Sequence, residues 1–565
     1  MALWYALRMT KARKDHDPSW RSRLLWVGKW LGIPLLVYLL FFTGYASTWM
    51  LHFNTRFFTD QGDGYQNVWN MWWVNYAVIH LHQLPWHTAM LHYPYGTTLV
   101  GQTLNPFNGF VGIFLMHVLH LNLVQAFNTM VVFSFVFGGT TAFWLCYKFS
   151  HKYIPSLIGG FIFTFSSYHF AHAIGHMQLV SLEWIPLFIL LWWNLLTRPR
   201  YRTAVGAAVV LLLVLFCDYY YLLYSLLAAA LILIYVWYKK DLAPIKEKTT
   251  YRPFITFVVL TLLFVAPLPL ELFRDNSRDP LLGAHDARLF STDLFSLVLD
   301  GGFWHFAYLT HWYWHNVKAY IAESSVYFGV STIVLVCIAL WKRSKIHRDI
   351  NFWLILGAVF LILSFGPRLM VVGYSINHAP LPYAVIEKLL PQLKLSGDPD
   401  RFIVMTTLAI GVISSMVLAR LDLKQRKGQL LTGLFFAVLA LELWPGVFAI
   451  NVANAYPNYV NALKQLPPGA VLDNGALSQS WQLRDQTIDQ KPMALGYISR
   501  TPTSVFNKDQ QFVATVVPAG YPKLCSAYGI RYVTVPASRP LQTTFPIVYR
   551  DSSDLIYDIK DSPNC

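Results

Sequence analysis

The sequence predicts a polytopic α-helical membrane protein that ends in a small α/β domain. Of its 565 residues, 55% are hydrophobic and only 13% are charged, whereas a soluble protein carries about a quarter charged residues. Several apolar runs reach the roughly 18 residues that are typical of a membrane helix. After residue 450 these runs stop and Pro, Asn, Gln and Asp become frequent, which indicates a separate soluble domain.

The hydrophobic runs predict about 11 membrane spans. A shorter apolar piece, Phe107 to His120, is expected to form an interfacial or re-entrant helix instead. With the N-terminus in the cytoplasm and the C-terminus outside, most Lys and Arg of the short loops fall on the cytoplasmic side, as the positive-inside rule requires. The net charge of +15 then needs no nucleic-acid partner. The predicted spans are residues 24–50, 123–147, 154–171, 179–197, 203–219, 221–238, 254–272, 325–341, 352–367, 402–419 and 429–448.

This topology divides the chain into a membrane part, 1–450, and an extracytoplasmic domain, 451–565. The large outer loops of the membrane part are 52–122, 273–324 and 368–401. The inner loops are all short and no nucleotide-binding glycine loop is visible, so the working face is expected outside a cytoplasmic membrane. In the tail, β-like runs are expected at 470–472, 530–535, 547–549 and 555–557.

Two of the five cysteines, Cys525 and Cys565, lie in this predicted outer domain. An oxidising compartment would allow a disulfide between them. Two unpaired thiols are the alternative, and no cysteine spacing typical of a metal site appears.

The first outer loop opens with two carboxylates, Asp60 and Asp63, in front of the aromatic stretch 65–73. Acidic groups at the mouth of a span are costly to desolvate, so they indicate a functional site. A solvated loop that happens to hold two acids is the alternative.

Further polar side chains gather at the outer ends of the predicted spans, while the inner face is almost purely basic. His169, His172 and His176 have a spacing that faces one side of a helix, although Gly175 is expected to interrupt it. Hydrogen-bonded interfacial histidines, an aromatic belt and ordinary interface anchors are the alternatives. The candidate substrate-binding residues are His172, His176, Glu183, Tyr221, Arg274, Glu323 and Arg401.

An outward-facing enzyme has no nucleotide sugars at hand, so its donor is expected to be carried by a lipid. A sugar on polyprenyl phosphate fits, because its tail lies in the bilayer and its sugar phosphate lies at the interface. One carboxylate would remove the proton from an acceptor hydroxyl. Arg274 would stabilise the departing lipid phosphate.

A series of short motifs, in this order, resembles bacterial members of the GT-C superfamily of integral-membrane glycosyltransferases. The resemblance implies an inverting transfer from a polyprenyl-phosphate sugar to an envelope glycan, lipid or protein on the outer side. It implies a catalytic aspartate in the first outer loop, where Asp63 fits best and Asp60 is the runner-up. The motifs are Gln61-Gly62-Asp63 before the Trp-rich stretch, Tyr93-Pro94-Tyr95-Gly96, Leu104-Asn105-Pro106, Gly175-His176, Trp184-Ile185-Pro186-Leu187, Glu323 with Tyr327-Phe328-Gly329, Asp400-Arg401-Phe402, Gly496-Tyr497-Ile498-Ser499-Arg500 and Tyr528-Gly529-Ile530-Arg531-Tyr532-Val533.

The same resemblance bears on metals. Many members are thought to need none, so no cofactor is expected. Oligosaccharyltransferase-type relatives use a divalent cation held by acids of the first and second outer loops. Asp60, Asp63 and His176, together with Glu183, are the alternative metal ligands here.

Two other functions are alternatives to that of a glycosyltransferase. A transporter or flippase for a lipid-linked glycan would want polar residues through the middle of the bilayer and repeated halves, and neither is evident. A non-catalytic envelope assembly protein would use the tail to bind a partner.

Overall fold

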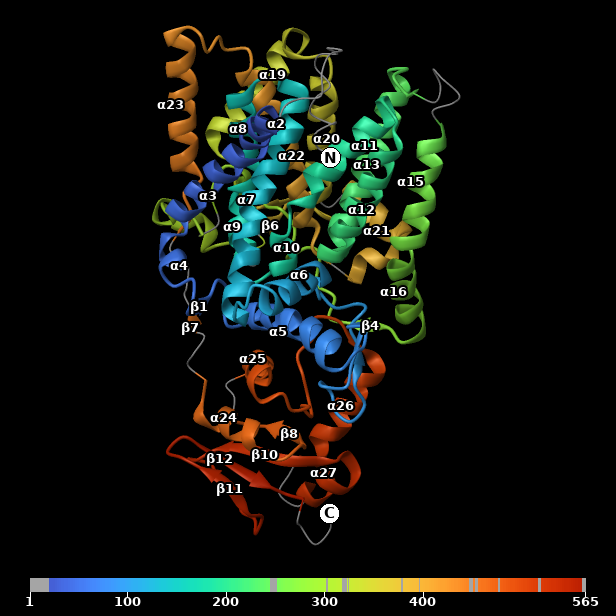
Figure 1. The fold of residues 1–565 in the computed structure, drawn as a ribbon, viewed down its shortest axis with the longest axis vertical. Coiled ribbons are helices and arrows are strands. Elements are labelled where there is room, and N and C mark those ends of the chain that lie inside the picture. Colours follow the sequence, from blue (N-terminus) through green and yellow to red (C-terminus); the bar gives the residue numbers. More distant parts are fainter. Residues whose placement is uncertain are drawn as a thin grey trace.

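In the computed structural model of the chain, a bundle of long helices stands over a small sheet with helices around it (Figure 1). Helices α5 and α6 lie across the bundle end between these two parts. The structure describes residues 20–243, 251–300, 303–317, 323, 325–376, 380–395, 397–446, 451–452, 456–475, 478–516 and 520–560.

Every predicted span contains a helix in the structure. Four helices are long and apolar enough to cross a membrane, or five if a bent pair counts as one, and this count covers the described residues alone. The chain is therefore a mostly helical membrane protein, and the number of 11 crossings stays a prediction. The helices in these ranges are α2 (Trp20–Val27), η1 (Gly28–Gly32), α3 (Ile33–Tyr45), α7 (Leu123–Ser150), α8 (Tyr153–Thr164), α11 (Trp184–Thr197), α12 (Tyr201–Cys217), α13 (Tyr219–Tyr238), α15 (Tyr251–Phe264), α16 (Pro267–Arg278), α19 (Val330–Ile346), α20 (Ile350–Ser364), α22 (Ile403–Leu418) and α23 (Arg426–Glu442).

Several predicted spans are interrupted, and two of the breaks have a clear local cause. Helices α15 and α16 meet at a 40° bend, where Pro267 lacks the N–H that a continuous helix would use. The predicted span 154–171 splits into α8 and α9 (Ser167–Ala173) because the Ser166 side chain caps the second helix, accepting from the backbone N–H of His169. The break lets α9 carry its histidines away from the line of α8.

The connection between α12 and α13 is a single residue. Asp218 lies between them, and its Oδ1 accepts a hydrogen bond of 2.6 Å from the backbone N–H of Tyr220. Residues 218–221 are predicted to lie between the two spans, and the capping side chain fixes the junction at Asp218.

The Trp-rich stretch forms α5 (Asp63–Asn75), which is buried from its second residue to its last. It packs on α6 (Pro106–His117) on one side and on the tail helix α25 (Gln479–Asp489) on another. The prediction of a short helix in the range 107–120 is confirmed. The first residue of α5, Asp63, therefore sits where the helical bundle and the tail meet.

The tail contains a four-stranded mixed sheet in the order β11-β12-β10-β8, which pairs β8 with β10 in parallel and the others antiparallel. Its strands coincide with the four β-like runs of the sequence. Cys525 is disulfide-bonded, while Cys565, its predicted partner, lies outside the described residues. The tail elements are α24 (Asn458–Gln465), β8 (Ala470–Asp473), α26 (Thr503–Thr515), α27 (Tyr521–Tyr528), β10 (Ile530–Pro536), β11 (Ile547–Arg550) and β12 (Asp554–Asp558), besides α25.

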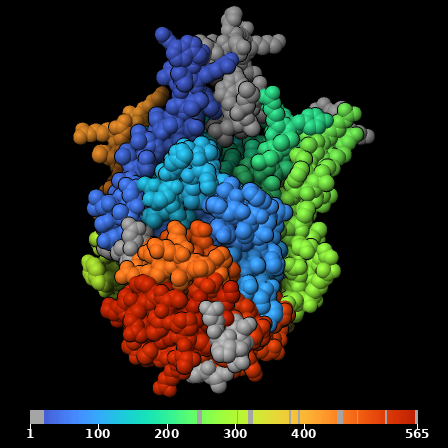
Figure 2. Space-filling model, turned by 60° about the horizontal axis from the view of Figure 1, so that its bottom comes forward, coloured from blue at the N-terminus to red at the C-terminus, as the bar shows by residue number. Residues whose placement is uncertain are grey.

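Short strand pairs join the tail to the outer loops. β1 (Arg56–Phe57) pairs with β7 (Asn451–Val452), and β4 (Leu281–Leu282) pairs with β9 (Thr501–Pro502). Figure 2 shows the orange and red tail covering one end of the molecule beside the blue first loop. The tail thus docks on the loops that carry the candidate residues.

Candidate functional site

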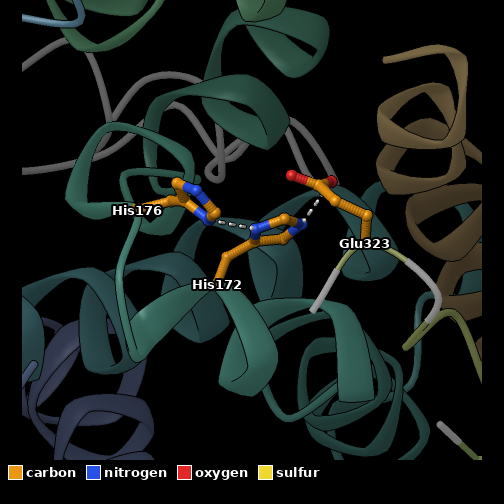
Figure 3. A group of neighbouring side chains, drawn as sticks. All are labelled: His172, His176 and Glu323. Carbon is orange, nitrogen blue, oxygen red and sulfur yellow. Dashed lines mark hydrogen bonds and ion pairs between the residues drawn. The ribbon is translucent and has the colours of Figure 1, made fainter. Parts of the chain in front are cut away.

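Five of the candidate residues form one connected polar cluster. His176 Nε2 lies 3.3 Å from Asp63 Oδ2, and His176 Nδ1 lies 3.1 Å from His172 Nδ1. His172 Nε2 lies 3.5 Å from Glu323 Oε2. Figure 3 shows the two imidazole rings and the Glu323 carboxylate side by side, joined by these contacts. The fifth candidate residue is Arg401, whose Nη2 lies 2.6 Å from Glu323 Oε1.

The loops that carry Asp63 and His176 are fastened together by backbone bonds. The N–H of Asp60 donates to the carbonyl of Ile174 at 2.5 Å, and Thr59 Oγ1 donates to the same oxygen at 2.8 Å. Gly175 follows in this turn, and a Cβ there would come within 2.9 Å of Asp60 Oδ2. Glycine accommodates this close approach without a shift of the Asp60 carboxylate, and the next residue, His176, contacts Asp63.

Arg401 extends the cluster toward the other outer loops. Its guanidinium contacts Glu323 through two nitrogens, and its Nη1 lies 2.9 Å from Asp398 Oδ2. Asp398 Oδ1 in turn lies 2.7 Å from His285 Nδ1. The ring of Tyr220 packs against the guanidinium at 5.4 Å, a cation–π distance. Groups from four separate loops are thus linked.

The charges within the cluster are complementary. Burial raises the pKa of Asp63, but hydrogen bonds from His176 and Tyr497 outweigh it and hold that pKa below the ordinary 3.8. Burial lowers the pKa of His176, but Asp63 outweighs it and holds that pKa above the ordinary 6.5. Asp63 and His176 therefore form an ion pair near pH 6.

Burial and neighbouring charges also set the pKa values of two further residues of the cluster, His172 and Glu323. Burial, with a smaller effect of the nearby His176 and Arg401, lowers the pKa of His172 to about 3 although Glu323 opposes the shift, so this imidazole is neutral. Burial raises the pKa of Glu323, but Arg401 and the two histidines outweigh it and hold that pKa below its ordinary value. Glu323 is accordingly ionised beside Arg401.

Asp60 has a different environment from Asp63. Its Oδ1 accepts from the backbone N–H groups of Gly62 at 3.0 Å and Gly64 at 2.8 Å. Burial raises the pKa of Asp60 above 3.8 despite these bonds. Two neighbouring carboxylates with opposite pKa shifts are a frequent feature of acid–base sites.

Three candidate residues lie outside the direct contacts of this cluster. Glu183 Oε2 accepts from Ser134 Oγ of α7 at 2.6 Å. The hydroxyl of Tyr221 donates to the backbone oxygen of Leu179, in a layer behind His172. Arg274 lies on the exposed face of α16, where its Nη1 is 3.4 Å from Glu271.

A largely apolar cavity of about 470 Å³ adjoins the cluster. Leucine side chains of α13 and α16, with Pro269 of α16, form much of its wall. The polar residues on its wall include Asp218, Tyr220 and Arg500. Tyr220 is shared between the two regions, because its ring also packs on Arg401.

Arg500, which the tail contributes to the cavity wall, is 9% exposed. Its Nη1 donates to the carbonyls of Gly283 at 2.8 Å and Ser499 at 2.7 Å, and its Nη2 to Tyr220 at 3.4 Å. All three partners are neutral, and no carboxylate within the described ranges forms an ion pair with it. A nearly buried cation without a counter-ion is a strong candidate for binding an anion.

One group of described residues has metal-ligand geometry. Ligand atoms of His172, His176 and Glu323 all lie within 4.8 Å of one another. The set shares only His176 with the alternative proposed from the sequence, Asp60, Asp63 and His176. Two imidazoles and a carboxylate are donors that zinc and similar ions accept.

Several residues of the site were not assigned roles from the sequence. Tyr497 and Arg500 lie in the motif 496–500, and Asp398 lies just before Asp400-Arg401-Phe402. These motifs were recognised in the sequence, but they did not predict a function for the three residues. His285 had no signal, since a single histidine in a loop indicates nothing by itself.

Fold and site together define a helical membrane protein with an ionisable cluster and an apolar cavity between its bundle and a C-terminal domain. The chain belongs to the family described as "Domain of unknown function (DUF6311)", whose model matches residues 1–444. No curated protein matches it.

Solved structures resemble the whole chain at low sequence identity. The archaeal oligosaccharyltransferase AglB from Archaeoglobus fulgidus, in complex with an inhibitory peptide and a dolichol-phosphate, is 11% identical, with a TM-score of 0.43 over 92% of this chain and 70% of its own. ArnT from Cupriavidus metallidurans bound to undecaprenyl phosphate is 12% identical, with a TM-score of 0.42 over 92% and 97%.

A third structure is the arabinofuranosyltransferase AftD from Mycobacteria, which is 14% identical, with a TM-score of 0.47. It aligns with 90% of this chain, which spans only 35% of AftD.

Proposed function

We propose that this protein transfers a sugar from a polyprenyl-phosphate carrier to an envelope glycan, lipid or protein, with inversion, on the outer side of the cytoplasmic membrane. One observation carries the proposal. The partly exposed carboxylate of Asp63 is fixed in place by two side chains. An apolar cavity that shares Tyr220 with the same cluster holds in its wall the cation of Arg500, whose hydrogen-bond partners within the described residues are all neutral. Such a pairing suits a substrate with a hydrocarbon tail, a phosphate and a reacting sugar.

The cavity and Arg500 would bind the lipid end of the donor. Its apolar lining suits an isoprenoid chain, whose burial is favourable by the hydrophobic effect. The Arg500 guanidinium would pair with the phosphate, and it would stabilise the negative charge that grows on that phosphate as the sugar leaves. Arg274, the cation proposed from the sequence, faces solvent and pairs with Glu271, so Arg500 is the better supported of the two.

Asp63 would act as the general base. Its side chain is 40% exposed, so an acceptor hydroxyl has access to it. The hydroxyl oxygen attacks the anomeric carbon while its proton passes to the Asp63 carboxylate. The bond from the anomeric carbon to the phosphate oxygen breaks, and the lipid phosphate leaves with the electron pair. Attack opposite the leaving group inverts the configuration.

His176 would support this step by its charge. As an imidazolium next to Asp63, it keeps the carboxylate ionised and oriented before the proton arrives. Glu323 and Arg401 would hold His172 and, through it, His176 in place. Tyr221 lies behind His172 and Glu183 lies against α7, so both are assigned supporting positions.

The proposal does not require a resident cofactor. If a divalent metal binds, His172, His176 and Glu323 would hold it, and its charge would help neutralise the departing phosphate. Each of these three side chains already has a partner in the structure, namely His172 with His176 and Glu323 with Arg401.

Purified protein in nanodiscs, supplied with a panel of polyprenyl-phosphate sugars and an envelope extract, tests the proposal. We expect free polyprenyl phosphate and a glycosylated product by mass spectrometry with the wild type, and neither with Asp63→Asn. Movement of the intact lipid across proteoliposomes, with no bond broken by either protein, would instead favour a transporter.

A further inference from the structure

The tail residues 496–500 lie directly against the candidate base. The hydroxyl of Tyr497 donates a hydrogen bond of 2.7 Å to Asp63 Oδ1. On the other oxygen, His176 Nε2 lies 3.3 Å from Asp63 Oδ2. Both carboxylate oxygens are thus engaged, one by the membrane part and one by the tail.

The segment is docked by bonds that do not involve the Tyr497 hydroxyl. Ser499 Oγ donates to Gln66 Oε1 at 2.9 Å, and Gln66 Nε2 donates to the Tyr497 carbonyl at 3.3 Å. The backbone N–H of Ser499 donates to Gln102 Oε1 at 2.8 Å. Loss of the Tyr497 hydroxyl alone would therefore leave the segment in place.

A second contact nearby fixes the tail on the same helix. Trp69 Nε1 donates to Gln486 Oε1 at 2.6 Å, and both side chains are fully buried. The guanidinium of Arg484 packs over the ring of Tyr65 at 5.2 Å. Since Tyr65 and Trp69 belong to the helix that begins at Asp63, the tail holds this helix along about two turns.

We propose that Tyr497 is a positioning residue for Asp63, so the C-terminal domain supplies part of the active site and is not an appended module. The inference rests on the proposed function, in which Asp63 is the base. A phenol O–H can only donate to an ionised carboxylate here, so it favours the charged form and fixes one oxygen. With Oδ1 held by Tyr497 and Oδ2 by His176, the lone pairs that remain free on the carboxylate point in a defined direction.

The kinetic test compares Tyr497→Phe with a matched control, Tyr532→Phe. The control removes a tyrosine hydroxyl of the same domain that donates to the carbonyl of Pro467 at 3.0 Å, inside the sheet region. We expect Tyr497→Phe to lower kcat about tenfold, to leave the donor KM unchanged, and to move the acidic limb of the rate profile up by about one pH unit. Tyr532→Phe should change none of these.

A second measurement needs no enzymatic activity. A carbodiimide activates only the protonated carboxyl, so the pH dependence of Asp63 labelling, read by peptide mass spectrometry on the full-length protein in nanodiscs, reports its pKa. We expect the labelling profile of Tyr497→Phe to shift upward by about one pH unit, while melting temperature stays close to wild type. An unshifted profile in a folded Tyr497→Phe protein would overturn the inference.

The two measurements separate the two proposals. If wild type transfers no sugar but the labelling profile still shifts, the function is wrong and the Tyr497–Asp63 coupling stands. If wild type transfers sugar and Tyr497→Phe equals it in rate and pH profile, the function stands and Tyr497 has no positioning role.

Discussion

His176 Nε2 lies 3.3 Å from Asp63 Oδ2, although the two residues come from separate outer loops. The contact follows the turn at Gly175, where an added Cβ would come within 2.9 Å of the Asp60 carboxylate. It moves both pKa values, that of Asp63 down and that of His176 up. The charges of Asp63 and His176, and with them the strength of their contact, therefore depend on pH.

The pair should make stability depend on pH. A lowered Asp63 pKa contributes stability above 3.8 that is lost as pH falls through its value in the folded protein. A raised His176 pKa contributes stability below 6.5 that is lost as pH rises through its folded value. We expect the melting temperature of wild type to exceed that of His176→Gln most between about pH 4 and 6.5, and the difference to shrink on both sides. A difference that, by scanning fluorimetry, is as large below about pH 4 and above about pH 6.5 as it is between them would contradict the pairing.

Asp60 and Asp63 should respond differently to loss of charge. In Asp60→Asn the amide oxygen still accepts from the N–H groups of Gly62 and Gly64, so we expect transfer to stay within a few fold of wild type. In Asp63→Asn the base is lost, and we expect the rate to fall by about 10² to 10⁴. The rates are compared in the same preparation, with Asp286→Asn, an exposed loop acid paired with Arg288, as control. The reverse order would make Asp60 the base.

Substitution of the two candidate cations, Arg500 and Arg274, should have different effects on the KM for the donor. Loss of a charge-assisted contact to phosphate in Arg500→Gln should raise the donor KM about 10- to 100-fold. Arg274→Gln should leave it unchanged, because that guanidinium is exposed and paired with Glu271. Initial rates measured over a range of donor concentrations give the donor KM of each variant. A raised KM in Arg274→Gln alone would restore the assignment made from the sequence.

The Glu323–Arg401 pair should matter for folding far more than an exposed pair does. Both side chains are at most 5% exposed, so Glu323→Gln leaves a buried guanidinium with a weaker partner, and destabilisation of about 3–5 kcal/mol is expected. Glu271→Gln breaks the exposed pair with Arg274 and should cost less than about 1 kcal/mol. Equal shifts in the two unfolding midpoints would contradict the buried position of the pair.

Transfer should survive removal of divalent metals. Glu323 is engaged by Arg401, and the Nδ1 atoms of His172 and His176 face each other. Most of the donor atoms therefore have partners without an ion, although the buried Nε2 of His172 makes no hydrogen bond within the described residues. We expect activity after EDTA treatment to stay within about twofold of the untreated protein. Activity that EDTA removes, a divalent ion restores, and His172→Ala abolishes would show that the cluster is a metal site.

Much of the membrane part could be predicted because apolar periodicity reports burial directly. The predicted range 402–419, for example, contains α22, and the range 123–147 falls three residues short of the end of α7. The breaks at Ser166 and Pro267 were missed because each depends on a local capping or ring effect inside an apolar run.

The sequence predicted the residues of the cluster, but it did not predict which of them contact one another. Asp63, His172, His176, Glu323 and Arg401 were all placed at outer span ends, since topology brings those ends together. Which of them touch depends on loop paths such as the turn at Gly175. Arg274 was assigned to the phosphate because charge and position are visible in the sequence, whereas the direction of a side chain after the bend at Pro267 is not.

The most direct test of the account is mass spectrometry of envelope glycans, lipids and glycoproteins from a deletion strain complemented by wild type or by Asp63→Asn. The account predicts that one sugar disappears on deletion and that only the wild type restores it, with both proteins present in the membrane in equal amounts. If Asp63→Asn restores the sugar equally well, the carboxylate is not the base and the account is wrong at its centre.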